Sequence, residues 1–388
     1  MVVEYNDYGE LTMGGTSLKT VAQSFGTPTF VYDETQIRDQ IRQYHAAFQK
    51  SGLNYNISYA AKAFICLQMV KLIQEEGLKL DVVSEGELYT ALEAGFDPKD
   101  IHFHGNNKTK REIRYALENK VGYIVVDALD EIDLIEKYAH EPVDVVIRLN
   151  PGVEAHTHEF IQTGQEDSKF GLSIEHGLAL EAVKRINETE HLNLKGVHFH
   201  IGSQIEGTEA MIETARIVLQ WLKDENIEVE LLNLGGGFAI KYVEGDERFP
   251  IDSGIEAITD ALKDIADKLD YPLPEIGIEP GRSIVGEAGI TLYEVGTIKS
   301  IPGVNKYVSI DGGMSDHIRT ALYDASYEAL LVNRNEPADE KVTVAYHYSM
   351  ASNYNQMQKP SVFFLKDGKA REVIKRQTLR QLIINDTK

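Results

Sequence analysis

The sequence predicts an α/β fold in which a (β/α)8 barrel, or TIM barrel, is joined to a β-rich second domain. Three observations support this prediction. Short apolar runs alternate with amphipathic helical patterns over most of the chain, polar side chains follow the ends of those runs, and strand-like runs without long helices make up the C-terminal part. We therefore expect a barrel over residues 28–283, with residues 1–27 and 284–388 forming the β-rich domain.

Eight runs in the first part of the chain are typical of buried strands. They are Tyr55–Tyr59, Lys79–Val83, Ile101–His104, Tyr123–Asp127, Asp144–Leu149, Gly196–Ile201, Glu230–Leu234 and Glu275–Glu279. Helical patterns lie between them, at Leu67–Glu75, Glu85–Ala94, Lys110–Asn119, Ala128–Tyr138, Ile174–Ile186, Glu209–Asp224 and Ile255–Leu269. Strands that alternate with helices indicate parallel βαβ units, and eight in succession favour a closed barrel over an open doubly wound sheet.

The C-terminal part of the chain has a different pattern. Strand-like runs occur at Thr291–Ser300, Lys306–Ile310, Ala329–Val332, Lys341–Ala345 and Ser361–Leu365. The N-terminal run Val2–Met13 has a similar short, alternating pattern. We therefore expect the N-terminal run to join the β-rich domain before the chain enters the barrel.

The composition excludes several classes of function. The 388 residues include 39 basic and 61 acidic residues, a formal net charge of −22, so we expect neither nucleic acid nor membrane as a partner. Cys66 is the only cysteine, which rules out a disulfide within the chain and fits a reducing compartment. The N-terminus is polar, and no apolar run is long enough to span a bilayer. We expect a cytoplasmic protein.

Polar side chains follow the predicted strands at their C-terminal ends, where the active sites of barrel enzymes are built. In chain order they are Lys62, Ser84, Glu85, Asn106, Asp127, Asn150, His200, Ser203, Glu279 and Arg282. Loops are polar in general, so each residue alone is weak evidence. Eight ends that include a lysine, a histidine and a glycine–arginine anion site favour a functional site.

Two runs at consecutive strand ends predict a phosphate site. Leu234–Phe238 contains the glycine triplet Gly235, Gly236 and Gly237, whose backbone N–H groups can close around an anion. Glu279–Arg282 adds an arginine beside a Pro-Gly turn, and a guanidinium binds phosphate or carboxylate with two parallel hydrogen bonds. In barrels such a site typically lies after the seventh and eighth strands.

A phosphate site near a strand-end lysine favours pyridoxal phosphate. This cofactor needs a lysine that forms a Schiff base, a phosphate site, a group over the ring face and a partner for the ring nitrogen. Lys62 can supply the lysine, His200 can stack on the ring, and Glu279 can hold the ring nitrogen protonated. The phosphate site would be formed by Ser203, Gly235, Gly236, Gly237 and Arg282.

A metal-dependent hydrolase is the competing hypothesis. Three His-x-His pairs occur, and alternate residues of a strand share a face, so each pair could chelate a metal. The pairs are His102/His104, His156/His158 and His198/His200. This interpretation leaves the phosphate site unexplained, and we expect no metal. Cys66 lies at an apolar helix start and is more typical of a small buried residue than of a nucleophile.

Seven runs resemble one enzyme family, in order and over nearly the whole chain. They begin at Ser58, Asp81, Asp167, His198, Gly235, Glu279 and Tyr348. In letters they read Ser-Tyr-Ala-Ala-Lys-Ala, Asp-Val-Val-Ser-Glu-Gly-Glu-Leu, Asp-Ser-Lys-Phe-Gly-Leu, His-Phe-His-Ile-Gly-Ser-Gln, Gly-Gly-Gly-Phe, Glu-Pro-Gly-Arg and Tyr-Ser-Met-Ala-Ser-Asn-Tyr-Asn. Together they resemble the diaminopimelate decarboxylases, a family of fold type III pyridoxal-phosphate enzymes.

The resemblance implies an alanine-racemase-like barrel with a β domain, a homodimer with active sites at its interface, and conversion of meso-2,6-diaminopimelate to L-lysine and CO2. It implies that Lys62 carries the cofactor and that His200 stacks on it. The implied cofactor-binding residues are Lys62, Asp81, His200, Ser203, Gly235, Gly236, Gly237, Glu279, Gly281, Arg282 and Tyr346. The implied substrate-binding residues are Arg282, Arg319, Tyr323 and Tyr346. An arginine fork suits a carboxylate, which favours diaminopimelate over ornithine or lysine.

One segment of the family is missing. The family carries a Cys-Glu-Ser-Gly-Asp run in its β domain, whereas here Lys341–Ala345 is followed directly by Tyr346. Either the domain has lost roughly 30 residues between residues 345 and 346, at usual strand and loop lengths, or the sequence omits that stretch. In the family, the cysteine is the proposed proton donor and the adjacent glutamate binds substrate across the dimer interface. The loss of those strands would also expose sheet edges and weaken the β domain.

Three functions remain open from the sequence. The first is a lysine-forming diaminopimelate decarboxylase. The second is a catalytically impaired relative that binds pyridoxal phosphate but releases little or no CO2, because of the missing segment. The third is a related decarboxylase that acts on ornithine, arginine or a carboxylated polyamine.

Overall fold

The computed structural model describes residues 3–152, 168–323, 325–335, 343–346, 361–366 and 369–374. These residues form two compact units. The larger unit contains the described residues of Arg38–Lys241 and Asp246–Gly286. The smaller unit contains the described residues of Met1–Ile37, Tyr242–Gly245 and Glu287–Lys388.

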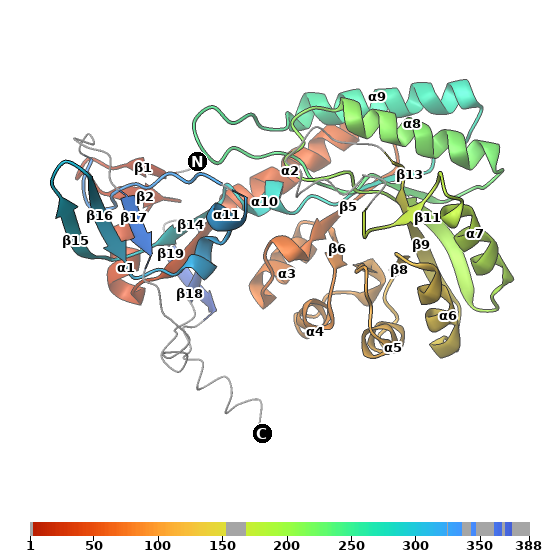
Figure 1. Ribbon diagram of the computed structural model, residues 1–388, viewed down its shortest axis with the longest axis horizontal. Coiled ribbons are helices and arrows are strands. Elements are labelled where there is room, and N and C mark those ends of the chain that lie inside the picture. Colours follow the sequence, from red (N-terminus) through yellow and green to blue (C-terminus); the bar gives the residue numbers. More distant parts are fainter. Residues whose placement is uncertain are drawn as a thin grey trace. The chain divides into compact units, whose positions relative to one another are not determined.

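The larger unit is a closed barrel of eight parallel strands (Figure 1). The strands are β5 (Tyr55–Ala60), β6 (Lys79–Val82), β7 (Ile101–Phe103), β8 (Tyr123–Val126), β9 (Val143–Asn150), β11 (Leu192–His198), β12 (Leu231–Asn233) and β13 (Glu275–Ile278). Neighbours in sequence pair in parallel, β13 pairs with β5, and the short β10 (Leu172–Ser173) adds to β9. Closure of the ring confirms the predicted barrel.

Amphipathic helices alternate with the barrel strands and bury their apolar stripes. They are α2 (Glu34–Ser51), α3 (Leu67–Glu75), α4 (Glu85–Glu93), α5 (Lys110–Glu118), α6 (Leu129–Tyr138), α7 (Leu178–Glu188), α8 (Glu209–Asp224), α9 (Ile251–Leu269) and α10 (Arg282–Val285), with the 3-10 turns η1 (Ala61–Ala63) and η2 (Pro98–Asp100). Side-chain caps set several starts: Ser84 caps α4, and Thr109 with Glu112 forms a capping box on α5.

Three barrel elements begin four residues away from their predicted starts. Helix α9 begins at Ile251 rather than Ile255. Helix α7 begins at Leu178 rather than Ile174, because its N-cap Gly177 adopts φ +75°, a left-handed conformation that interrupts a helix. Strand β11 begins at Leu192 rather than Gly196 and pairs with β9 through an irregularity between Leu194 and Gly196.

The smaller unit contains three sheets. The first sheet is formed by β1 (Val3–Tyr5), β2 (Leu11–Met13) and β3 (Thr16–Ser17). The second sheet is formed by β4 (Thr29–Asp33), β14 (Gly289–Leu292), β18 (Ser361–Lys366) and β19 (Lys369–Ile374). The third sheet is formed by β15 (Val295–Ile301), β16 (Asn305–Ile310) and β17 (Thr343–Tyr346). The helical elements are α1 (Leu18–Phe25), η4 (Met314–His317) and α11 (Arg319–Leu322). Leu11, Leu18, Val31 and Leu292 pack in one buried cluster, so N-terminal and later segments share a core.

Three expectations for this part of the chain need correction. Strand β4 pairs with β14 and β18, so the residues just after position 28 belong with the β sheets rather than with the barrel. The run Thr291–Ser300 divides between β14 and β15, which pair with different strands. Residues Ala329–Val332 form no strand; the carbonyl of Val332 accepts a single hydrogen bond from Leu11 N–H, at 3.0 Å.

Among the described residues, none of the helices has the length and apolar character required to cross a bilayer. His156, His158, Asp167 and the run that begins at Tyr348 lie outside the described residues.

Candidate active site

The glycines of the two predicted phosphate-site runs let four strand-end loops of the barrel unit approach closely. A Cβ on Gly236 would lie 2.1 Å from the carbonyl oxygen of Glu279, and one on Gly237 would lie 2.1 Å from that of Gly202. A Cβ on Gly281 would lie 2.9 Å from the Ala60 carbonyl oxygen. Only glycine fits such contacts, so the loops after β5, β11, β12 and β13 are held together at one end of the barrel.

The loop that contains Gly235, Gly236 and Gly237, called the glycine loop below, also fixes the ring of His200. Gly236 N–H donates to His200 Nδ1 at 3.2 Å, which requires that this nitrogen carry no proton. Burial, together with the charges of Lys62 and Arg148, holds the pKa of His200 well below its usual range. The structure therefore presents His200 as a neutral imidazole beside the glycine loop.

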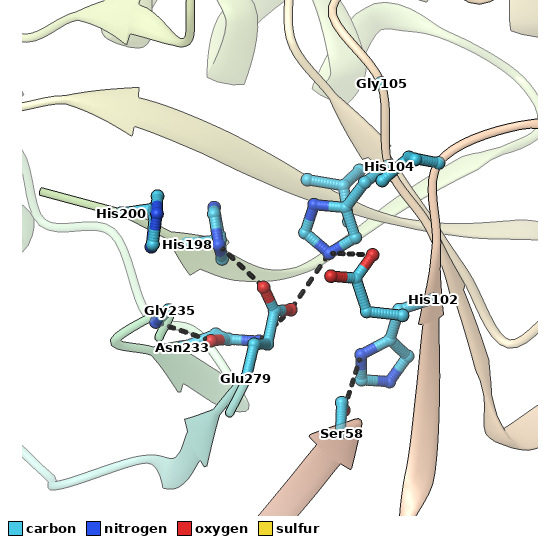
Figure 2. Close-up of polar contacts among 12 residues, drawn as sticks. Ser58, His102, His104, Gly105, His198, His200, Asn233, Gly235 and Glu279 are labelled. Carbon is cyan, nitrogen blue, oxygen red and sulfur yellow. Dashed lines mark hydrogen bonds and ion pairs between the residues drawn. The ribbon is translucent and has the colours of Figure 1, made fainter. Parts of the chain in front are cut away.

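Glu279, the residue after β13, is buried and accepts three hydrogen bonds (Figure 2). His104 Nε2 donates to Oε1 at 2.9 Å, and Asn233 Nδ2 donates to the same oxygen at 2.8 Å. His198 Nε2 donates to Oε2 at 3.1 Å. Asn233 Oδ1 in turn accepts from Gly235 N–H at 2.9 Å, which ties the carboxylate to the glycine loop.

Charge in this cluster is distributed unevenly. Burial opposes ionisation of Glu279, but the two histidines outweigh it and hold the pKa of the carboxyl well below its usual value. Burial also opposes protonation of His104, but Asp81 and Glu279 outweigh it and raise the pKa of that imidazole. Burial lowers the pKa of His198 to about 4, so His198 is neutral at neutral pH. Glu279 is thus held as an anion, and His104 takes up a proton more readily than His198 does.

Asp81 lies on β6 beside this cluster. Its Oδ1 is 3.7 Å from His104 Nε2 and has no hydrogen-bond partner among the described residues. Burial raises the pKa of Asp81 to about 6, against the charges of His104 and Lys62. The structure therefore brings together Asp81 on β6, His104 directly after β7 and Glu279 directly after β13.

Lys62, Ser203 and Arg282 lie on the loops that the glycines hold together. Lys62 is in η1, directly after β5, and its side chain is exposed. Ser203 is in the loop after β11, which pairs with the glycine loop through Ile205 N–H to the Gly237 carbonyl at 2.9 Å. Arg282 begins α10 and donates from Nη1 to Gln204 Oε1 at 3.4 Å. An amine, a hydroxyl and a guanidinium thus lie on the loops after β5, β11 and β13, at the same end of the barrel.

Other strand-end polar residues have structural roles. Asp127 Oδ1 accepts from Gly171 N–H at 2.9 Å, and its Oδ2 lies 3.4 Å from Nη1 of the buried Arg148. Lys108, which the sequence analysis missed, is buried and donates to Glu131 Oε1 at 2.6 Å. A lysine in the loop after a strand gave no signal that it would be buried, because two of its acceptors, the Val125 carbonyl on β8 and Glu131 on α6, come from later elements of the chain.

The metal hypothesis finds one geometric match. Ligand atoms of His104, His198 and Glu279 all lie within 4.8 Å of one another. These histidines come from two different His-x-His pairs, whereas the competing metal hypothesis placed both histidine ligands within one pair. The other member of the first pair, His102, has Nδ1 3.2 Å from Ser58 Oγ. Both imidazoles already donate hydrogen bonds to the Glu279 carboxylate, which is an arrangement that needs no ion.

The predicted substrate residues lie in the smaller unit. Arg319 begins α11, and its guanidinium stacks at 4.7 Å over the ring of Tyr242 and at 5.9 Å over that of Tyr323. Its Nη1 is buried without a hydrogen-bond partner among the described residues. Tyr346 is the last residue of β17 and pairs with Ile310. A buried, unpartnered guanidinium nitrogen suits an incoming carboxylate.

Known proteins resemble this chain over its whole length. Residues 34–286 match a family model described as "Pyridoxal-dependent decarboxylase, pyridoxal binding domain". The chain is 71% identical to a curated diaminopimelate decarboxylase of Staphylococcus aureus (strain COL), over 100% of both chains. The chain belongs to the diaminopimelate decarboxylase family. The family that the motifs predicted is therefore confirmed.

More distant members of the family agree in sequence and in structure. The chain is 44% identical to the diaminopimelate decarboxylase of Bacillus subtilis (strain 168), over 97% of this chain and 95% of that protein. It also resembles a crystal structure of diaminopimelate decarboxylase from M. jannaschii in co-complex with L-lysine. That match has a TM-score of 0.90 at 33% identity and covers 99% of this chain and 97% of the other.

The comparison with the family also bears on the missing segment. The alignment with the S. aureus protein spans 421 positions, 33 more than the 388 residues of this chain. That relative therefore carries about 33 residues that this chain lacks, which agrees with the predicted shortening. Cys66 is the only cysteine here, and the structure places it at the N-cap of α3, where its Sγ accepts from Met69 N–H.

Membership of this family implies pyridoxal 5'-phosphate as the cofactor, and the described residues fit it. A carboxylate has about four lone-pair directions, and the three donors to Glu279 leave one of them, on Oε2, for a further donor such as a protonated ring nitrogen. Lys62 offers an exposed amine at the same barrel end, and His200 offers a neutral ring whose plane is held by Gly236.

Proposed function

We propose that this chain binds pyridoxal 5'-phosphate and converts meso-2,6-diaminopimelate to L-lysine and CO2. The observation that carries the proposal is the buried Glu279 carboxylate, ionised and with one acceptor position left, in a chain 71% identical over its whole length to a curated diaminopimelate decarboxylase. An anion at this place holds a ring nitrogen protonated. Pyridoxal phosphate, when bound, then acts as an electron sink for the bond that breaks at the carboxylate.

Each strand-end residue has a distinct task in this proposal. Lys62 holds the cofactor as a Schiff base, His200 covers the ring face, and Glu279 accepts the ring N–H. Asp81 adds negative charge beside His104. The phosphate is held by Ser203, Gly235, Gly236, Gly237, Gly281 and Arg282.

Arg319 supports the choice of substrate. A guanidinium binds a carboxylate with two parallel hydrogen bonds, whereas an amine at the far end of ornithine or lysine would be repelled. Nη1 of Arg319 is buried and has no partner among the described residues, so a carboxylate would satisfy it. We propose that Arg319 holds the distal carboxylate of diaminopimelate, with Tyr323 and Tyr346 beside the substrate and Arg282 near a carboxylate or the phosphate.

One observation favours a second candidate function. The chain lacks about 33 residues that its S. aureus relative carries, and the sequence places the loss at the Cys-Glu run of the β domain. If that run is required for turnover, the chain binds pyridoxal phosphate but releases little or no CO2. The two candidates share the cofactor site and differ only in turnover.

The test is lysine formation by the purified chain with pyridoxal phosphate and meso-diaminopimelate. Lysine in the wild type but not in Lys62→Ala supports the decarboxylase. An absorption band of lysine-bound cofactor that is lost in Lys62→Ala, without lysine from any diamino acid, supports the impaired relative. Carbon dioxide from ornithine or arginine but not from diaminopimelate would support the related decarboxylase.

We further propose that the chain is a homodimer with active sites at its interface and that it works in the cytoplasm. The family resemblance supports the dimer, and a single cysteine fits a reducing compartment. Light scattering should give a mass twice that of the 43.5 kDa chain. A monomer with full activity would contradict an active site that needs both subunits.

A further inference from the structure

The carboxylate of Glu279 is held by side chains from the ends of three different barrel strands (Figure 2). His104 directly follows β7, His198 ends β11, and Asn233 ends β12. The two histidines bind different oxygens, at 2.9 Å to Oε1 and 3.1 Å to Oε2. A carboxylate bound through both oxygens cannot rotate about its last bond without losing one of these hydrogen bonds.

The three donors also restrict which oxygen remains available. Oε1 accepts from both His104 and Asn233, whereas Oε2 accepts from His198 alone among the described residues. With about two lone pairs on each oxygen, the remaining acceptor direction lies on Oε2. The histidines therefore set both the plane of the carboxylate and the direction in which it can accept a further hydrogen bond.

We propose that His104 is a positioning residue for the cofactor: by its hydrogen bond to Oε1 it fixes the Glu279 carboxylate so that Oε2 faces the ring nitrogen. The inference rests on the proposed function, because it concerns the same site and the same cofactor. His198 shares the task, and His104 is the better test because its imidazole also lies 3.7 Å from Asp81 and edge-on to the His198 ring, with centroids 4.9 Å apart.

His102 provides a matched control. It is the same residue type, two positions earlier in the chain and on β7 itself, and it is similarly buried, at 1% exposure against 4% for His104. Its hydrogen bond goes to Ser58 and not to Glu279. A leucine at either position removes a buried imidazole and one hydrogen bond. Of the two substitutions, only His104→Leu would remove a hydrogen bond to the Glu279 carboxylate.

The experiment compares His104→Leu, His104→Gln and His102→Leu in the full chain. The amide nitrogen of glutamine reaches about as far as Nε2 of histidine and keeps a donor for Oε1. Three quantities are measured: the dissociation constant of pyridoxal phosphate, the absorption spectrum of the bound cofactor, and the midpoint of thermal unfolding without cofactor. Lysine formation, with kcat and KM, is measured in parallel.

We expect His104→Leu to weaken cofactor binding by roughly ten- to a hundredfold, the usual effect of a lost hydrogen bond to a charged group. It should also change the visible spectrum and lower kcat more than it changes KM. His104→Gln should recover most of the affinity and the wild-type spectrum. His102→Leu should lower the unfolding midpoint as much as His104→Leu while it changes the dissociation constant by less than about threefold.

Several results would overturn the inference. One is equal loss of affinity in His104→Leu and His102→Leu, which indicates a general structural role. Another is a folded His104→Leu protein with unchanged affinity and spectrum, and a third is stoichiometric zinc in the wild type that is lost in His104→Leu. A wild type that binds the cofactor but forms no lysine contradicts the decarboxylase proposal alone, because the affinity comparison still decides the role of His104.

Discussion

Replacing Gly235 with alanine tests whether the glycine run packs the strand ends together. Gly235 has φ +71°, and an added Cβ would lie 2.4 Å from the Phe199 carbonyl oxygen and 3.0 Å from His200 Cβ and Nδ1. The left-handed backbone costs an alanine about 1–2 kcal/mol. The overlap with backbone atoms costs about 1–3 kcal/mol more, because the loop must shift. We expect Gly235→Ala to lower the free energy of unfolding by about 2–5 kcal/mol in total.

Gly77→Ala is the matched control for this prediction. Gly77 has φ +75°, nearly the same conformation, but no heavy atom lies within 4 Å of an added Cβ. It should therefore lose only the backbone contribution, about 1–2 kcal/mol. Urea unfolding and cofactor titration of both variants make the comparison. Gly235→Ala should also weaken cofactor binding, because the shift displaces the His200 ring. Equal losses of stability, with cofactor affinity unchanged in both variants, would refute the packing argument.

Three further predictions concern pH, substrate and chain length. The pKa values of His102 and His198, lowered by burial to about 3 and about 4, mean that the unfolded chain binds protons below pH 6.5 that the folded chain resists. As the pH is lowered, the free energy of unfolding should fall by roughly 1.4 kcal/mol per pH unit for each histidine. Asp81, whose pKa is raised to about 6, partly offsets this loss. Thermal unfolding from pH 7.5 to 4.5 checks the prediction, and a flat profile would contradict it. Arg319→Ala should abolish diaminopimelate turnover but spare any activity on ornithine, and an unchanged diaminopimelate rate would sink the assigned role. Intact mass spectrometry should give 43.5 kDa, whereas a larger mass would mean that the segment between residues 345 and 346 is present.

The barrel could be predicted because its evidence is local. Apolar runs of strand length and amphipathic helical patterns appear in every βαβ unit, and α3 and α8 have the predicted bounds, Leu67–Glu75 and Glu209–Asp224. The β sheets were harder to predict, because a strand there depends on a partner far away in sequence. Ala329–Val332 has the composition of a strand but makes a single hydrogen bond to Leu11 instead of a ladder.

The sequence predicted where the candidate residues lie in the barrel, but it did not predict their contacts with one another. Position at a strand end placed Lys62, His200 and Glu279 at one end of the barrel. The pattern could not show that His104 and His198 bind Glu279, because β7, β11 and β13 are not all neighbours and the alignment of their ends depends on how the ring closes. The His-x-His pattern was the available signal for these contacts, but the pattern is compatible with metal ligands and with hydrogen-bonded histidines inside a barrel, and it names no partner for either.

The most direct test of the account is a single assay of the purified chain. Pyridoxal phosphate and meso-diaminopimelate are added, and L-lysine and CO2 are quantified by mass spectrometry, with Lys62→Ala as the control. The account predicts equal amounts of L-lysine and CO2 from the wild type and none from Lys62→Ala. A wild-type protein that shows the absorption band of lysine-bound cofactor but releases neither product would contradict it, and would identify the missing segment as the cause.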